Sequence, residues 1–159
     1  RAETLDTRGK RFSLSAPDNF CLIRSGQDLR AVKGDELDEY EQQIEPALRA
    51  GLAFLADNPS TGCFDSRYMQ HCSQHGEPIR KTFGMQLFLS ITHMLEWAKS
   101  HPTHLEIFNR FQSMAMRKQG QFDLRLWHEV VVCAEGDIRA EYINCNRQTG
   151  LLPWAGMLS

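Results

Sequence analysis

The sequence predicts an α+β fold, in which an antiparallel sheet from an N-terminal and a C-terminal hairpin carries about three helices on one face. Three observations favour this fold. Short segments that alternate between apolar and polar residues lie near both ends of the chain. Apolar residues recur at spacings of three and four through the middle. The length of 159 residues suits one domain, so we expect a single domain over residues 1–159, with residues 1–10 frayed.

Two strands are predicted near the N-terminus. Residues 11–15 alternate between polar and apolar side chains, which is typical of a strand with one buried face. A turn over residues 17–19 follows, with the sequence Pro-Asp-Asn. Residues 20–23 are Phe-Cys-Leu-Ile and predict a second, more buried strand, which we expect to end at Ser25-Gly26.

An amphipathic helix is expected after Asp35, which is a suitable N-cap and is followed by further acidic residues. Its apolar stripe has spacings of three and four and consists of Leu37, Tyr40, Ile44, Leu48, Leu52 and Leu55. Pro46 interrupts the stripe. Because proline lacks the amide hydrogen that a helix interior requires, we expect a kink or a fresh helix start at Pro46.

The middle of the chain is harder to assign. Residues 63–82 show little periodicity and predict an irregular segment with one short strand over residues 67–69. Helical spacing resumes at Met85, and we expect that helix to end at His101-Pro102.

A further helix is predicted from a capping box. Thr103 and Glu106 have the spacing at which a hydroxyl and a carboxylate satisfy the first amide groups of a helix. Gly120 is a natural end for this helix.

The C-terminal part predicts a hairpin. Residues 122–132 alternate as a strand, and Ala134-Glu135-Gly136 forms a three-residue loop before a returning strand. This register places His128 opposite Tyr142. A histidine on an apolar strand face is more often a core residue that is hydrogen-bonded to a hydroxyl, and we favour that interpretation. The alternative is an acid–base group of His128, Tyr142 and Glu129.

Composition excludes some classes of protein. The 18 basic and 20 acidic residues give a net charge of −2, which argues against a nucleic-acid binder. No apolar run is long enough for a membrane span. The chain starts at Arg1 and not at methionine, which is expected if an export signal was removed or the chain was trimmed.

Five cysteines are present, and we predict a disulfide between Cys63 and Cys72, which flank a polar loop. A second bridge would join Cys21 to Cys133 or Cys145. The alternative is five buried thiols in a reducing compartment.

The segment from Cys63 to His75 is also the densest group of reactive side chains. Its metal-ligand types are Cys63, Asp65, His71, Cys72 and His75, which are the donors that zinc prefers. The spacing matches no known finger, so a zinc site is the alternative to a disulfide-linked loop. A cysteine nucleophile paired with a histidine is a further alternative.

No common nucleotide, phosphate or hydrolase motif occurs, and we expect no cofactor. The first functional hypothesis is a non-enzymatic exported domain that binds a protein or envelope component, as an inhibitor or accessory factor. Its predicted contacts are Trp127, Ile143 and Trp154, since aromatic and apolar residues are enriched at interfaces. The second hypothesis is a small hydrolase or metalloprotein that uses the segment from Cys63 to His75.

The opening of the chain, Ala2-Glu3-Thr4 followed by a Phe-x-Leu-x-x-Pro-x-x-Phe-Cys segment over residues 12–21, resembles small exported proteobacterial proteins of unknown function. The resemblance implies a periplasmic α+β protein. It implies no functional residue and does not separate a binding protein from an enzyme.

Overall fold

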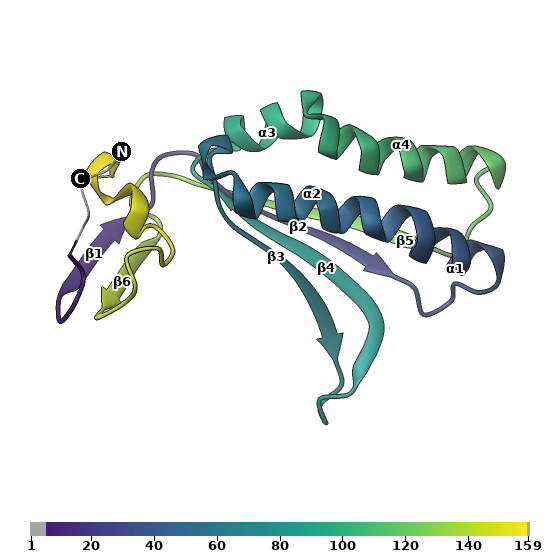
Figure 1. Cartoon of the computed structure of the whole chain (residues 1–159), viewed down its shortest axis with the longest axis horizontal. Helices are drawn as coiled ribbons and strands as arrows, with labels where there is room; N and C mark the ends of the chain where they lie inside the picture. Colours follow the sequence, from purple (N-terminus) through teal and green to yellow (C-terminus); the bar gives the residue numbers. More distant parts are fainter. Residues whose placement is uncertain (1–5, 159) are drawn as a thin grey trace.

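The computed structural model describes residues 6–158. Its regular elements, in chain order, are β1 (Arg11–Ser15), β2 (Phe20–Asp28), α1 (Asp35–Glu39), α2 (Glu45–Asp57), β3 (Cys63–Cys72), β4 (Pro78–Phe88), α3 (Ile91–Ser100), α4 (Pro102–Arg117), β5 (Arg125–Cys133) and β6 (Arg139–Ile143). The α+β fold is confirmed. Figure 1 shows α2, α3 and α4 on one face of the larger sheet, while β1 and β6 form a separate small sheet at one end. Within the described part of the chain, no helix has the length and apolar character needed to cross a membrane.

The strands form two antiparallel sheets, one with the order β3-β4-β2-β5 and one that pairs β1 with β6. The two predicted terminal hairpins are therefore wrong, because the strands of each belong to different sheets. The N-terminal segment instead runs against the C-terminal segment twice, as β2 with β5 and as β1 with β6. The predicted turns are present at residues 17–19 and 134–137, but a turn signal sets only the local direction of the chain and not the partner of each strand.

The segment predicted to be irregular is a long hairpin of β3 and β4, and the helix predicted from Met85 begins later, at Ile91. Figure 1 shows the far end of this hairpin projecting away from the helical layer. Both faces of the projecting part are open to solvent, so its sequence lacks the alternation that marks a half-buried strand. The turn is closed by a hydrogen bond from the Ser73 amide to the Glu77 carbonyl, with Gly76 at a φ of 83°.

The helix interruption predicted at Pro46 is confirmed. A π-helical turn covers Tyr40–Ile44, and α2 begins at Glu45 with Pro46 in its first turn. Proline is tolerated there because the first amide groups of a helix have no partner within the helix.

The start of α4 differs from the predicted capping box. The helix begins at Pro102, and the N-cap is His101, whose Nδ1 accepts a hydrogen bond from the Thr103 amide at 3.3 Å. Thr103 lies inside the first turn, where its hydroxyl oxygen accepts a hydrogen bond from Trp97 Nε1 at 3.1 Å. The threonine therefore joins α4 to α3 and does not cap its own helix.

Two apolar clusters hold the helices on the sheet. One contains Cys21, Leu55, Cys63, Phe88, Met94 and Trp97, at the first residues of β2 and the last residues of β4. The other contains Leu29, Val32, Tyr40, Ile44, Met114 and Leu124, beyond the other end of β2. The helical layer is thus fixed near both ends of β2, and the middle of that strand is left to line a pocket.

The segment predicted to be frayed is in part ordered. Residues 1–5 lie outside the described residues. Residues 6–10 form a turn in which the Lys10 amide donates to the Thr7 carbonyl at 3.2 Å, and the Gly9 amide donates to Asn144 Oδ1 at 2.9 Å. The turn is therefore bound to the chain that follows β6.

The five cysteines, all within the described residues, are free thiols. The predicted Cys63–Cys72 disulfide does not form in this fold, because the two residues are the first and last of strand β3. A strand rises by about 3.3 Å per residue, so their Cα atoms are far beyond the ~7 Å limit for a bridge. Cys21 and Cys133 are near each other on β2 and β5, where the register pairs Cys133 with Phe20, but they are unbridged as well.

Candidate functional site

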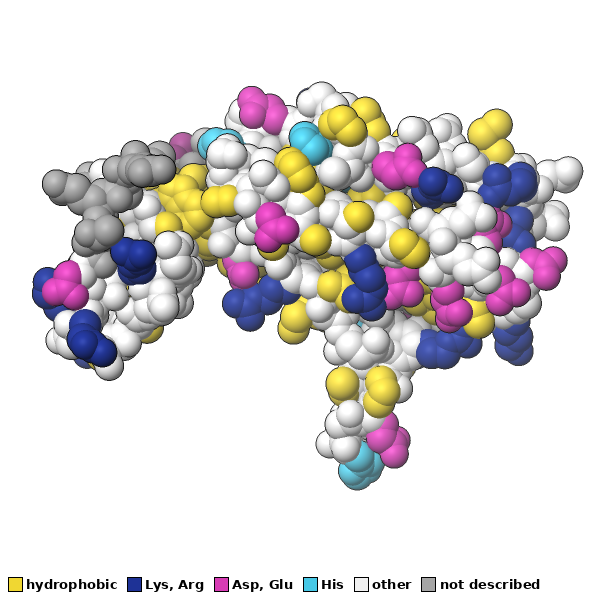
Figure 2. Space-filling model, in the orientation of Figure 1, with side chains coloured by type: hydrophobic (Ala, Val, Ile, Leu, Met, Phe, Trp, Pro, Cys, Tyr) yellow, Lys and Arg dark blue, Asp and Glu magenta, His cyan; other side chains and the backbone are white. Residues whose placement is uncertain are grey.

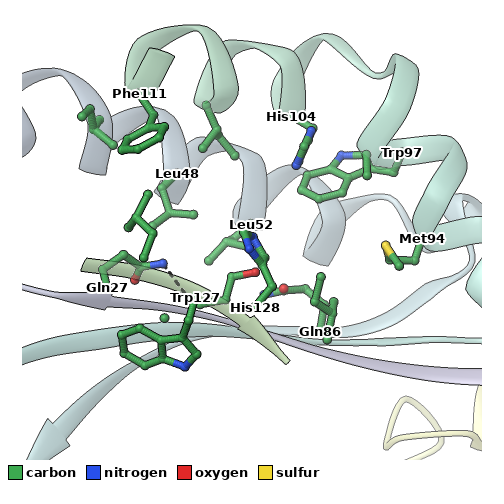
Figure 3. A pocket seen from close by; sticks show the side chains of 17 residues that line it. Gln27, Leu48, Leu52, Gln86, Met94, Trp97, His104, Phe111, Trp127 and His128 are labelled. Carbon is green, nitrogen blue, oxygen red and sulfur yellow. Dashed lines mark hydrogen bonds between the residues drawn. The ribbon is translucent and has the colours of Figure 1, made fainter. Parts of the chain in front are cut away.

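A pocket lies between the helix-covered face of the larger sheet and the helices α2, α3 and α4. It contains about 730 Å³ of space not filled by atoms, including its open mouth. Its walls are mainly apolar, with Ile23, Leu48, Leu52, Met94, Ile107 and Phe111 among the lining residues. Figure 3 shows its polar side chains: Gln27, Gln86 and His128 come from the sheet, and His104 comes from the helical layer.

The strand register brings two reactive side chains of the sheet together. Ser25 on β2 is directly opposite His128 on β5, and both line the pocket. Directly opposite residues of an antiparallel pair have Cβ atoms only about 5 Å apart, so the hydroxyl and the imidazole are neighbours on the pocket floor. The register also shows that the predicted pairing of His128 with Tyr142 is wrong, because Tyr142 pairs with Phe12 in the small sheet.

The pocket is open along β5, which is an edge strand of the larger sheet. The side chains of β5 that share a face with His128 are Leu126, Val130 and Val132, and they are 38%, 45% and 44% exposed. Such a row of exposed apolar side chains beside a pocket is typical of a binding surface. His128 is itself exposed at this edge, yet its apolar neighbours reduce its hydration, which lowers the pKa of the imidazole.

The second histidine of the pocket is His104, which lies on α4 and is half-buried. Its ring packs edge-on against the indole of Trp97, with 4.8 Å between the ring centroids, and its Nδ1 is buried without a hydrogen-bond partner. Desolvation lowers the pKa of His104, the carbonyl of Ala98 acts in the opposite direction, and His128 lowers the pKa further. Both imidazoles line the same pocket, and Figure 3 shows them on facing walls.

The position of Trp97 is itself fixed by a short hydrogen-bonded network. Its Nε1 donates to Thr103 Oγ1 at 3.1 Å, and Thr103 Oγ1 lies 2.9 Å from His101 Nδ1. The ring of His101 in turn stacks on Phe54, with 4.2 Å between the centroids. The indole that faces His104 is therefore held from behind by α2 and by the start of α4.

A second network supports the pocket floor under Ser25. Gln27 Nε2 donates to the Ser25 carbonyl at 2.8 Å, and Gln27 Oε1 accepts from Thr82 Oγ1 at 2.9 Å. The hydroxyl of Tyr68 lies 3.1 Å from both Thr82 Oγ1 and Glu45 Oε1. This chain of hydrogen bonds runs from a carboxylate on α2 to the backbone of β2, and it fixes the strand segment that carries Ser25.

The predicted metal site is not assembled. Cys63, Asp65, His71, Cys72 and His75 are spread along β3 and its turn, and strand residues at odd and even positions point to opposite faces. Within residues 6–158, no group of three or more His, Cys, Asp or Glu side chains has the arrangement of a metal site. The space-filling view in Figure 2 shows this hairpin as a narrow projection with no body of protein around its tip.

The predicted binding residues lie on separate elements. Trp127 is on β5 and points to the sheet face away from the helices (Figure 3), where its ring covers Gly26 and lies 4.7 Å from the Lys81 ammonium. Ile143 is at the end of β6 and is 57% exposed. Trp154, in the C-terminal helical turn, packs edge-on against Phe64 at 5.8 Å. Binding through these residues stays a prediction.

Comparison with known proteins gives consistent matches. A family model described as haem-containing dehydratase matches residues 1–151. The chain is 38% identical over 147 residues to phenylacetaldoxime dehydratase of Bacillus sp. (strain OxB-1), covering 92% of this chain and 42% of that protein. It is 39% identical over 145 residues to aliphatic aldoxime dehydratase of Rhodococcus globerulus, covering 91% of this chain and 40% of that protein.

Solved structures of aldoxime dehydratases also resemble this chain. A crystal structure of an aldoxime dehydratase in complex with butyraldoxime superposes with a TM-score of 0.76 at 36% identity, covering 91% of this chain and 40% of that one. The crystal structure of another aldoxime dehydratase gives a TM-score of 0.77 at 35% identity, covering 95% of this chain and 43% of that one. The chain thus spans about 40% of the length of the relatives it matches.

These matches overturn two predictions made from the sequence. The resemblance to small exported proteins of unknown function is wrong, as is the hypothesis of a non-enzymatic protein-binding domain, because the matched relatives are enzymes. The absence of common motifs misled that hypothesis, since this pocket is assembled from separate strands and helices. The matches cover nearly the whole chain, and the chain belongs to the haem-containing dehydratase family.

Proposed function

We propose that this chain contributes the haem pocket of an aldoxime dehydratase, with His104 as the protein ligand of the haem iron and His128 as the acid–base residue. The observation that carries the proposal is the pair of imidazoles that face each other across one open, apolar pocket. The substrate class is taken from the names of the relatives, which act on aliphatic aldoximes and phenylacetaldoxime.

The residues present fit a haem. A haem is a flat and largely apolar macrocycle, and the row Leu126, Val130 and Val132 is left exposed beside the pocket. Covering that row would remove apolar surface from water, which is favourable. A histidine that holds a haem iron would bind it through a nitrogen of a neutral imidazole, and His104 has a lowered pKa and an Nδ1 without a hydrogen-bond partner.

His104 is the better candidate for the ligand because its surroundings hold its ring in one orientation. Trp97 packs against one edge of the ring, and the backbone of Ala98 is close enough to raise the pKa of the imidazole. A ligating histidine commonly uses its second nitrogen in such a contact with a backbone carbonyl, which fixes the tautomer and raises the basicity of the ring. His128 has the more open position, because it is exposed on the edge strand β5.

Dehydration of an aldoxime, R–CH=N–OH, gives the nitrile R–C≡N and water. The C–H and N–O bonds break, a third carbon–nitrogen bond forms, and no external oxidant or reductant is needed for the balance. Haem held through His104 would supply an iron that binds and polarises a small polar ligand.

The chain's own residues would handle the proton. A neutral imidazole carries one N–H donor and one free nitrogen, so His128 can hold the oxime oxygen by a hydrogen bond and move a proton at that atom. Ser25, directly opposite His128 in the register, offers a hydroxyl to the same oxygen. The apolar lining keeps bulk water away from the inner part of the pocket and strengthens both hydrogen bonds.

The test is a haem titration followed by an assay. Purified protein is titrated with haemin, and the expected result is one equivalent bound with a Soret band typical of histidine ligation. The loaded protein is then incubated with butyraldoxime in the ferric and the ferrous state, and butyronitrile is measured by gas chromatography. Failure to bind haem, or bound haem with no nitrile in either state, would overturn the proposal.

A further inference from the structure

Besides His104, a second pocket-lining side chain has a buried polar atom without a partner. Gln86 lies on β4 on the pocket floor, is 2% exposed, and its Nε2 has no hydrogen-bond partner among the described residues. A buried amide nitrogen without a partner lowers stability, because it loses its hydrogen bonds to water and gains none in return. Native proteins tolerate such groups where a ligand supplies the missing partner.

The chain contains a direct comparison. Gln27 is a second buried glutamine on the same pocket floor, at 5% exposure, and both ends of its amide are hydrogen-bonded. The two side chains have the same chemistry and similar burial. Gln27 supports the sheet, whereas Gln86 offers its donor to the pocket.

Local sequence leaves room for the Gln86 amide. A side chain at Gly84, two residues earlier on the same face of β4, would place its Cβ 2.9 Å from Gln86 Nε2 and 3.1 Å from Leu52 Cδ1. Real Cβ atoms do not come that close to such a nitrogen. Gly84 therefore allows the amide to lie flat on the sheet beneath Leu52.

We propose that Gln86 contacts the substrate, with its amide N–H donating a hydrogen bond to an acceptor atom of the aldoxime group. This inference rests on the proposed function. In the register, Gln86 is opposite Ile23 on β2, so it lies diagonally across from Ser25, and His128 lies on the other side of β2. The oxime nitrogen and oxygen are both neutral acceptors.

A neutral acceptor fits this position better than a carboxylate of the haem. None of the described residues that line the pocket is a lysine or arginine, so a carboxylate at Gln86 would be buried without a counter-ion. Burial of an unpaired charge is strongly unfavourable. The amide is therefore assigned to the substrate.

The first experiment needs no haem. Thermal unfolding is compared for the protein and for Gln86→Leu and Gln27→Leu. Because leucine removes an unsatisfied group, Gln86→Leu should leave the Tm unchanged or raise it by about 2–4 °C, whereas Gln27→Leu breaks two hydrogen bonds and should lower the Tm. A loss in Gln86→Leu as large as that in Gln27→Leu would show that Gln86 has a structural role and would overturn the inference.

The second experiment measures ligand binding to the haem-loaded protein through the shift of the Soret band. Gln86→Leu should weaken butyraldoxime binding about tenfold, which is one ordinary hydrogen bond, and should change the affinity for n-butylamine less than about twofold. If Gln86→Leu weakens the binding of both ligands equally, or changes the binding of neither, the inference about Gln86 is overturned and the proposed function is not. A native protein that binds no haem or no butyraldoxime overturns the proposed function and the inference with it.

Discussion

The pocket and the β3–β4 hairpin each contain two histidines, and the surroundings of the two pairs differ. His104 and His128 lie on facing walls of an apolar pocket, whereas His71 and His75 lie at the far end of the hairpin. His71 shares two properties with His104, one of the two pocket histidines. Its pKa is lowered, first by desolvation and then by Lys81 and Arg24, and its Nε2 is buried without a partner.

The difference lies in what surrounds each ring. His71 packs against Phe83, with 5.1 Å between the ring centroids, and it lies outside the pocket formed beneath the helices. His104 and His128 face a common space that a ligand can enter. A lowered pKa and an unpartnered nitrogen are therefore weak indicators alone, and they become informative at His104 because a second imidazole lines the same pocket.

The largest effect is expected at the proposed iron ligand. His104→Ala should weaken haem binding by at least about 100-fold, since loss even of residues that only support a metal ligand costs about 10- to 100-fold. His71→Ala is the matched control, because it removes a histidine with the same pKa direction, and it should change haem affinity less than about threefold. Haemin titration measures both, and equal effects would remove the distinction between the two regions.

The next effect separates the two walls of the pocket. His128→Ala should lower the rate of aldoxime dehydration by about 100- to 10,000-fold, which is the usual contribution of an acid–base residue. Haem affinity should stay within about threefold, because the iron ligand remains in place. A Soret spectrum and a single-turnover assay on the same sample check this, and loss of haem together with activity would show that His128 is the ligand.

The comparison also explains which parts could be predicted from the sequence. Patterns that depend on neighbouring residues were read correctly, such as the strand at residues 11–15 and the helix interruption at Pro46. The pairing of the strands was predicted wrongly, because long-range packing decides which strand pairs with β5. The β3–β4 hairpin escaped prediction because much of it is open to solvent on both faces.

The site was hidden for a related reason. Ser25 and Gly26 looked like the end of a strand, but β2 continues to Asp28. The polar residue is there because it faces the pocket, and the glycine is there because the ring of Trp127 occupies the place of its Cβ. His104 carried no sequence signal beyond its position in a helix, so a pocket-facing role could only be seen once α4 was placed over the sheet.

A smaller effect is expected in the pH dependence of stability. Desolvation holds the pKa of His104 and of His128 below the value of about 6.5 in an unfolded chain. Between the folded and unfolded pKa values the unfolded chain binds more protons than the folded chain. The free energy of unfolding therefore falls as the pH drops below about 6.5, and the contribution of the two neutral histidines is complete above that pH.

Urea denaturation of the haem-free protein at pH 7.5 and pH 5.5 measures this dependence. The double variant His104→Gln, His128→Gln should lose less stability than the native chain over that interval, with the remaining loss coming in part from His71. An unchanged pH dependence in the double variant would mean that neither imidazole is kept neutral by the pocket.

The smallest effect is expected at the hairpin turn, and it tests the region where the sequence placed the reactive cluster. Cys72 and His75 are exposed, and Cys72 is a free thiol. The double variant Cys72→Ser, His75→Ala should therefore change the free energy of unfolding by less than about 0.5 kcal/mol, as surface substitutions usually do. Haem affinity should change less than about twofold, because neither residue lines the pocket. Haemin titration and urea denaturation in the presence and absence of a reductant measure both quantities.

A stability that depends on the reductant in the native chain, and no longer does so in the variant, would require a disulfide that draws the two ends of β3 together. That result would contradict the extended strand itself, and with it the sheet register that brings Ser25 opposite His128.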